Sequence, residues 1–229
     1  MLYFQNHFLK IIFVGIMINI KSYKHIIWDW NGTLFNDVEL CANLMNILLK
    51  EAKLPIISIE EYRNVFTFPV IEYYKALGHD VEPKNWERIS HKFISDYETQ
   101  KYDYSIYSDA IMVLEKIKNF GISQSILSAY KQETLDELVS YSKIENYFIK
   151  LVGLDNIYAE GKIENGIKWM KELGFAKGEV LMIGDTLHDC EVAKAIGADL
   201  VLISSGHQSL NKLKTCNIPI IDSLSELVG

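Results

Sequence analysis

The sequence predicts an α/β protein in which a core built on a parallel sheet carries a small inserted helical domain. Short apolar runs alternate with helical stretches over residues 105–229. Strands and helices that alternate at this length indicate a parallel sheet with helices on both faces, as in Rossmann-like folds. Between Leu34 and Tyr107, by contrast, helical patterns occur without a convincing buried strand. A block of helices after a single strand indicates a separate small domain.

The N-terminal half is expected to contain one strand followed only by helices. The apolar run 26–28 predicts the first buried strand. A helix over 37–53 follows, because leucine and isoleucine recur at helical spacing until Pro55. Further helices are expected over three segments: 60–68, 69–77 and 83–102. We therefore assign 25–35 to the core and 36–104 to the inserted helical domain.

The remaining elements alternate along 105–229 and complete the core. Glycine, serine and aspartate mark where several of them begin or end. The expected helices cover 109–120, 134–141, 165–173 and 189–196. The expected strands cover 123–127, 148–152, 179–183 and 199–203.

Composition and charge narrow the class of protein. With 229 residues, of which 49% are apolar and 23% charged, the chain fits a globular core with one sizeable insertion. No basic stretch offsets the net charge of −7, which argues against general binding of nucleic acid. Cys41, Cys190 and Cys216 show no metal or redox spacing. We expect neutral thiols in a reducing compartment, and hence a cytoplasmic protein.

Residues 1–24 form an N-terminal extension of uncertain status. The apolar run 8–20 resembles the centre of a signal peptide, but it is too short to span a bilayer and lacks a basic start and a cleavage site. Residues 2–5 resemble part of a protease-tag sequence, and Met17 can serve as a natural start. We expect a dispensable extension without stable membrane association, and a targeting role is the alternative.

The segment 29–34 places an acid and a glycine turn directly after the first strand. Ligands of open α/β sheets bind just beyond the carboxyl ends of the strands. The carboxylate of Asp29 is therefore a candidate nucleophile or metal ligand. The alternative is that Asp29 only caps the helix that follows.

A second acidic pair, Asp185 and Asp189, follows the strand predicted over 179–183. Four positions separate the two, so one helical turn can bring both carboxylates toward the same point. Such a pair is also typical of a helix N-terminus, where the helix dipole favours acids. Together with Asp29 on a neighbouring strand end, the pair indicates a site for Mg²⁺, which prefers carboxylate oxygens.

Lys162 and Ser128 are weaker candidates for binding a phosphate. Lys162 lies in a loop that opens the helix before Asp185, and Ser128 ends the strand predicted over 123–127. Both have ordinary explanations, a solvated surface lysine and a turn serine. A serine hydroxyl with its neighbouring backbone N–H groups, and a lysine ammonium, are donors suited to phosphate oxygens.

In this order the motifs resemble the haloacid dehalogenase-like (HAD) superfamily of phosphohydrolases, over roughly residue 26 to the C-terminus. The first family motif, Asp-x-Asp-Gly-Thr, is matched by residues 29–33 with Asn31 in place of the second Asp. Ser128 and Lys162 stand at the second and third motifs. The fourth, Gly-Asp-x-x-x-Asp, falls on residues 184–189.

The resemblance implies a role for each of these residues. Asp29 would attack phosphorus and form an aspartyl-phosphate that water hydrolyses. Mg²⁺ would be held by Asp29, the backbone carbonyl of Asn31 and Asp185, with Asp189 acting through water or supporting Asp185. The phosphoryl group would be bound by Gly32, Thr33, Ser128, Ala129 and Lys162.

Asn31 departs from the family pattern, because the second Asp of the first motif normally transfers the proton and an amide does not titrate usefully. Losing general acid–base help typically costs about 10²- to 10⁴-fold in rate. Activity can persist on substrates with good leaving groups, such as acyl phosphates or phosphonates. Alternatively His79 or His91 substitutes, or the protein is a weakened enzyme or a phosphate-binding relative.

In this family a helical insertion after the first motif acts as a cap, here 36–104. Residues 67–78 are similar to the cap of phosphoglycolate-phosphatase-like members, and Tyr62, Arg63, Tyr73 and Tyr74 are candidate substrate contacts or core residues. The expected function is a phosphoric monoester hydrolase that acts on a small phosphorylated metabolite. A phosphosugar mutase, a metal-free dehalogenase and a binding protein are the alternatives, and the oligomeric state stays open.

Overall fold

The computed structural model describes residues 18–155 and 161–229. Most of the apolar run 8–20, the tag-like residues 2–5 and the candidate start Met17 lie outside the described residues. Ile20 is described and is buried in the core, and Lys24 pairs with Glu179 at 2.6 Å. This part of the expected extension therefore packs against the core. Among the described residues, no helix combines the length and apolarity needed to cross a membrane.

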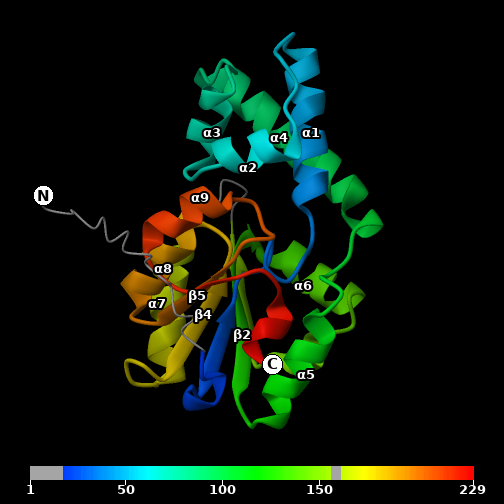
Figure 1. The fold of residues 1–229 in the computed structure, drawn as a ribbon. Helices are drawn as coiled ribbons and strands as arrows, with labels where there is room; N and C mark the ends of the chain where they lie inside the picture. Colours follow the sequence, from blue (N-terminus) through cyan, green and yellow to red (C-terminus); the bar gives the residue numbers. More distant parts are fainter. Residues whose placement is uncertain (1–17, 156–160) are drawn as a thin grey trace, which may run out of the picture.

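A single parallel sheet forms the centre of the fold (Figure 1). Its strands are β1 (His25–Trp28), β2 (Ser123–Lys131), β3 (Lys150–Leu154), β4 (Val180–Gly184), β5 (Asp199–Ile203) and β6 (Ile220–Ile221), in the order β3-β2-β1-β4-β5-β6. Every neighbouring pair is parallel. The predicted α/β class with a Rossmann-like parallel sheet is confirmed.

Helices cover both faces of the sheet, which explains the continuous apolar character of β1. Alternate strand residues point to opposite faces, so Ile26 and Trp28 pack in one core cluster and Ile27 in another. The first cluster includes residues of α5 (Ala110–Asn119) and α6 (Gln132–Tyr141). The second includes residues of α7 (Lys162–Leu173) and α8 (Leu187–Ile196), on the opposite side in Figure 1.

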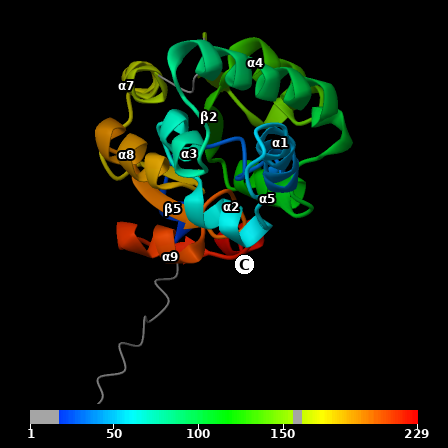
Figure 2. The same cartoon turned by 90° about the horizontal axis from the view of Figure 1, so that it is seen from above.

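Four helices between β1 and β2 stand beyond the carboxyl ends of the strands (Figures 1 and 2). They are α1 (Val38–Glu51), α2 (Ile59–Val65), α3 (Val70–Ala76) and α4 (Pro83–Gln100). Their apolar faces form a separate buried cluster, which includes Met45, Tyr73 and Ile89. A capping box between Ser58 and Glu61 fixes the start of α2. The boundaries 36 and 104 of the cap stay a prediction.

The chain after residue 203, for which the sequence predicted no element, adds short ones to the core. They are α9 (Leu210–Leu213), η4 (Lys214–Cys216), β6 and η5 (Leu224–Leu227). Elements of two to four residues carry too few apolar positions for a periodic pattern to reveal them. Leu213, Leu224 and Leu227 are nevertheless buried.

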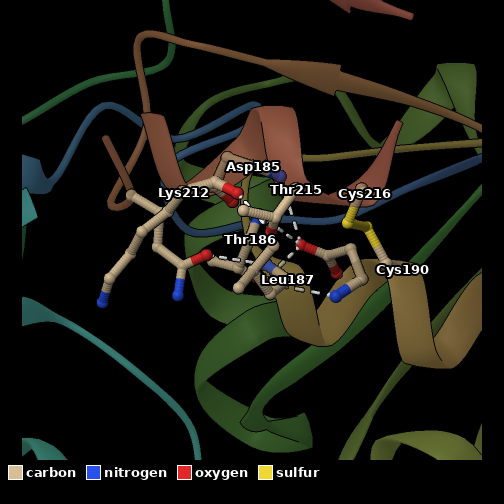
Figure 3. Close-up of a disulfide and its surroundings, with 9 residues drawn as sticks. Asp185, Thr186, Leu187, Cys190, Lys212, Thr215 and Cys216 are labelled. Carbon is tan, nitrogen blue, oxygen red and sulfur yellow. Dashed lines mark hydrogen bonds between the residues drawn. A yellow bond between two sulfur atoms is a disulfide. The ribbon is translucent and has the colours of Figure 1, made fainter. Parts of the chain in front are cut away.

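The prediction of three thiols is wrong for Cys190 and Cys216, which form a disulfide (Figure 3). Their spacing of 26 residues gave no signal, because the fold alone brings α8 beside η4. Cys41 is free and half-buried, and burial raises the pKa of its thiol well above the usual value, as expected for a neutral thiol. The argument from free thiols for a reducing compartment no longer holds.

Candidate active site

The sheet topology gathers the predicted strand-end residues along one edge. Because β1 pairs in parallel with both β2 and β4, Asp29 and Asp185 directly follow adjacent strands, and Ser128 lies in the neighbouring strand β2, which runs on to Lys131 instead of ending at Ser128 as predicted. A cavity of about 200 Å³ lies above this edge and extends under the cap. Asp29, Ser128, Lys162 and Asp185 all line it.

Lys162 joins two carboxylates at the floor of this cavity. It is the first residue of α7, not part of a preceding loop, and Gly161 precedes it with a positive φ of 108°. Its Nζ donates to Asp29 Oδ1 at 2.5 Å and to Asp189 Oδ1 at 2.7 Å. Burial alone would lower the pKa of Lys162, but the carboxylates of Asp189 and Asp29 outweigh it and raise that pKa. Lys162 therefore stays charged inside the protein, and the surface-lysine alternative is wrong.

Asp29 is buried at 7% exposure next to this ammonium. Burial raises the pKa of its carboxyl to about 6, against the lowering effect of Lys162. A divalent cation beside the carboxylate would favour the ionised form further.

Asp189 supports the site from the first turn of α8. Its Oδ2 accepts from the backbone N–H groups of Asp185 and Thr186, at 3.1 and 3.0 Å, and from the Thr186 hydroxyl at 2.7 Å. Burial would raise its pKa, but Lys162 and Thr186 lower it overall. With one oxygen held in this capping box and the other facing Lys162, Asp189 positions the loop and the lysine.

Asp185 is fully buried and held by the loops on either side. Thr33 Oγ1 donates to its Oδ1 at 3.0 Å, and the backbone N–H of His207 donates to its Oδ2 at 2.6 Å. A Cβ at Gly32 would lie 2.4 Å from Asp185 Oδ2, and one at Gly206 would lie 2.2 Å from it. Both glycines are needed because the backbone approaches this carboxylate so closely. Burial raises the pKa of Asp185 well above its usual value.

The donor set fits a hard divalent cation. Oxygens of Asp29, Asp185 and Asp189 all lie within 4.8 Å of one another. Three buried carboxylates with a single lysine among them leave negative charge that a cation of the Mg²⁺ type would neutralise. Asp29 and Asp185 would hold the metal, together with the backbone carbonyl expected at Asn31.

The remaining predicted phosphate ligands lie at the same edge of the sheet, but some of their polar groups already form hydrogen bonds within the protein. Ser128 and Ala129 line the cavity, and Ser128 Oγ accepts from the backbone N–H of Tyr130 at 3.0 Å. The serine hydroxyl therefore keeps its proton for another acceptor. The Gly32 N–H donates to Asp37 Oδ1 at 3.0 Å, and the Thr33 hydroxyl supports Asp185, so both act within the loop.

Asn31 lines the cavity, and its amide is fixed by hydrogen bonds toward the cap. Asn31 Nδ2 donates to Asp37 Oδ2 at 2.7 Å and to Tyr97 Oη at 2.9 Å. Tyr97 Oη in turn donates to the same Asp37 oxygen at 2.8 Å. The amide supplies a donor that a carboxylate at position 31 would lack.

Asp37 and His207 are site residues that the sequence analysis missed. Both are buried and line the cavity, with His207 Nε2 3.2 Å from Asp37 Oδ1 and His207 Nδ1 2.8 Å from Tyr62 Oη. Burial opposes the charge on each, but the pair lowers the pKa of Asp37 and raises that of His207. His207 lies four residues beyond the end of β5, so only a search further past each strand end would have selected it.

Neither histidine proposed to replace the missing acid reaches the site. His79 is buried behind Tyr74 and lines a different cavity, and His91 is exposed. Among the cap candidates, Tyr62, Tyr73 and Tyr74 line the active-site cavity. Arg63 does not: it donates to the carbonyls of Ser205 and Gly206, at 2.7 and 2.9 Å, and so binds α2 to the loop that carries His207.

Comparison with known proteins agrees with this geometry. Residues 26–203 match the family model of haloacid dehalogenase-like hydrolases, so the chain belongs to this family. The phosphoglycolate phosphatase of Pseudomonas savastanoi pv. phaseolicola is 23% identical over 91% of this chain and 79% of its own length. That of Aliivibrio fischeri is 19% identical over 91% of this chain and 93% of its own length.

A solved haloacid dehalogenase-like hydrolase from Streptococcus pneumoniae has the same fold, with a TM-score of 0.77 at 18% identity, over 90% of this chain and 97% of that one. The expected family, its phosphoglycolate-phosphatase-like branch and the expectation of a hydrolytic enzyme are confirmed.

Proposed function

We propose that the protein is a Mg²⁺-dependent phosphatase that hydrolyses a small phosphate monoester through an aspartyl-phosphate on Asp29. The observation that carries the proposal is the contact of one buried ammonium, Lys162, with both Asp29 and Asp189 at the floor of the cavity. The phosphoglycolate phosphatases similar to this chain support the same class of reaction. The phosphosugar mutase is disfavoured, because passing the phosphoryl group on needs the proton-transferring group that Asn31 lacks.

The charges around Asp29 support this chemistry. Besides Asp29, the buried carboxylates of Asp185, Asp189 and Asp37 contribute negative charge, and only Lys162 and His207 contribute positive charge among the described residues that contact them. A divalent cation brings the cluster to neutrality. Bound Mg²⁺ would screen the phosphoryl oxygens from the carboxylates, so that a phosphate dianion can approach Asp29.

The reaction has two steps. In the first, a carboxylate oxygen of Asp29 forms a bond to phosphorus, and the bond from phosphorus to the ester oxygen breaks with its electron pair on the leaving group. Lys162 and the Ser128 hydroxyl would hold the transferring oxygens. In the second, water attacks phosphorus, the bond to Asp29 breaks, and phosphate and one proton are released.

Asn31 limits which leaving groups this site can expel. Its amide is committed to Asp37 and Tyr97, and Asp37 is an ionised acceptor with a lowered pKa, so neither presents a carboxyl proton. A leaving group that is stable as an anion needs no protonation. This favours as substrates acyl phosphates, which are mixed anhydrides, and phosphate esters of acidic hydroxyl groups.

The proposal keeps the expected small-molecule partner and a cytoplasmic location. The support for that location is now only the similarity to phosphoglycolate phosphatases, since the Cys190–Cys216 disulfide removes the argument from free thiols.

A screen of phosphorylated metabolites with and without Mg²⁺, run on wild type and Asp29→Asn, tests the proposal. We expect Mg²⁺-dependent release of phosphate from acetyl phosphate by wild type, and a loss of at least about 10⁴-fold in Asp29→Asn. The matched control is Asp136→Asn, an exposed acid on α6 away from the cavity, which should keep wild-type rates. Turnover that survives in Asp29→Asn would contradict the nucleophile.

A further inference from the structure

We propose that the substrate is an aryl phosphate, a phosphate monoester whose leaving group is a single uncharged aromatic ring. The inference rests on the proposed phosphatase function and names the substrate class for the same site. Three features of the cap end of the cavity carry it: aromatic walls, the absence of a spare cation among the described lining residues, and a volume suited to one ring.

Aromatic side chains make up more than half of the cap residues that line the cavity. Phe66 and Phe68 lie between α2 and α3, Trp86 and Phe93 come from α4, and Tyr130 faces them from the core. Phe66 and Phe68 have centroids 5.5 Å apart at 83°. Trp86 and Phe93 pack edge-on against Tyr74, and Tyr130 packs edge-on against Tyr97. Ring edges and faces arranged in this way favour another aromatic ring between them.

Every described cation that lines the cavity already has a carboxylate partner. Lys162 binds Asp29 and Asp189, and His207 faces Asp37. Lys131 pairs with Glu133 at 2.6 Å, in an ion pair that is exposed to solvent. A carboxylate on the substrate besides its phosphate group, such as that of phosphoglycolate, would meet no unpaired lysine and would have to compete with Glu133 for Lys131, which disfavours its burial.

Glu98 is an acid on this wall, but it does not make the wall a binding site for a cationic leaving group. One oxygen of Glu98 accepts from Lys101 Nζ at 2.6 Å, and the other accepts from Tyr130 Oη at 2.5 Å. Both oxygens of Glu98 are therefore occupied, and Lys101 is shared with Glu137 at 2.8 Å. A neutral ring meets this wall without breaking either interaction.

The size of the cavity agrees with a single ring. An apolar cavity of about 150 Å³ in a protein interior accepts benzene. The cavity here has about 200 Å³, which must hold the phosphoryl group as well as the leaving group. A single ring with its phosphoryl group fits this space.

An aryl leaving group also suits a site without an acid at position 31. A phenol ionises with a pKa of about 10, whereas water, with a pKa of 15.7, is closer to an aliphatic alcohol. When Asp29 attacks phosphorus, the bond to the phenolic oxygen breaks and the electron pair leaves on a phenoxide, which takes its proton from solvent after release. The same apolar wall that binds the ring thus selects leaving groups that depart unprotonated.

Kinetics with four matched monoesters and acetyl phosphate test the inference. We expect kcat/KM for phenyl phosphate to exceed that for 2-phosphoglycolate and for phosphocholine by about 100-fold or more. Benzyl phosphate, with the ring but an alkoxide leaving group, should match phenyl phosphate in KM and fall below it in kcat. Phe93→Ala should lower kcat/KM for phenyl phosphate about tenfold more than for acetyl phosphate. Phe120→Ala, an exposed ring outside the cavity, is the control.

The outcomes separate the inference from the proposed function. If acetyl phosphate is hydrolysed through Asp29 but 2-phosphoglycolate or phosphocholine is preferred to phenyl phosphate, the substrate class is wrong and the phosphatase stands. If no ester is turned over, calorimetry on Asp29→Asn with Mg²⁺ still compares the affinities of phenyl phosphate and 2-phosphoglycolate. Equal affinities, or no binding of phenyl phosphate, would overturn the inference.

Discussion

At the sheet end of the cavity the walls are carboxylates, an ammonium and an imidazole, whereas at the cap end they are aromatic rings. At the sheet end, each buried charge depends on a partner from another element. Lys162 comes from α7, Asp29 follows β1 and Asp189 comes from α8. The cap end depends on shape and apolar contact. We therefore expect that replacing one side chain lowers stability and activity far more at the sheet end than at the cap end.

Replacing Lys162 by Met is the strongest test of that difference. It leaves Asp29 and Asp189 buried without their shared counter-charge, and breaking a buried pair in this way costs about 3–5 kcal/mol. Urea unfolding without metal measures the loss, and saturating Mg²⁺ should reduce it by supplying positive charge. Lys150→Met is the control, because its pair with Glu172 is exposed and should contribute less than about 1 kcal/mol. Equal effects of the two variants would contradict the claim that the buried charges at the sheet end depend on one another.

The disulfide (Figure 3) lies at the same end of the molecule. Cys190 directly follows Asp189 in α8. Closing a loop of 26 residues stabilises the fold by about 3–4 kcal/mol in the chain-entropy account. We expect the double variant Cys190→Ala/Cys216→Ala to lose this amount in urea unfolding. Reductant should bring wild type to the level of the double variant and leave that variant unchanged. No change on reduction would mean that the bond contributes nothing.

His25, at the opposite end of β1 from Asp29, should make the stability of the fold depend on pH. Its imidazole is buried between the hydroxyls of Ser123 and Ser125, both at 2.7 Å, and burial lowers its pKa from 6.5 to about 4. Above about pH 6.5, His25 is neutral in both the folded and the unfolded protein. Below it the unfolded chain binds the proton first, so stability falls as the pH drops from about 6.5 to about 4.

The lowered pKa of His25 changes the free energy of unfolding by about 3 kcal/mol over this pH range, since each pKa unit is worth 1.36 kcal/mol. His25→Asn should therefore lose correspondingly less stability than wild type between pH 6.5 and 4, as measured by urea unfolding at each pH. Identical pH slopes in the two proteins would show that His25 is not held neutral.

Of these variants, Asn31→Asp has the smallest expected effect, and whether activity rises or falls tests the role of the amide. A carboxylate at position 31 would face Asp37 at the 2.7 Å now spanned by a hydrogen bond, so the two acids would repel each other. We expect kcat/KM for acetyl phosphate to fall about tenfold, or 1.4 kcal/mol. The swap Asn31→Asp/Asp37→Asn keeps one acid and one amide and should recover most of the loss. A single variant faster than wild type would show that Asn31 is a simple defect.

Much of the sheet end could be predicted from the sequence, because it obeys a rule of topology. Asp29 and Asp185 each directly follow a buried apolar strand, Ser128 ends the buried part of β2, and parallel strands bring such positions together. His207 lies four residues beyond the end of β5, a strand that was predicted with the same bounds, so a search for residues directly after each strand did not reach it. Asp37 could not be separated from an ordinary helix start, since its partners are 60 and 170 positions away.

The cap end was less predictable, because aromatic residues at helical spacing give the same pattern whether they form a core or line a cavity. Tyr73 contributes to both the cap core and the cavity wall. Only the packing of α2, α3 and α4 over the sheet decides which rings remain available to a ligand.

The most direct test of the account is to locate the phosphoryl group during turnover. The reaction of wild type with acetyl phosphate and Mg²⁺ is quenched in acid, and the protein is digested and examined by mass spectrometry. We expect one phosphoryl group on Asp29, which is absent in Asp29→Asn and absent when the metal is removed. A phosphoryl group on any other residue, or unchanged labelling in Asp29→Asn, would contradict Asp29 as the nucleophile.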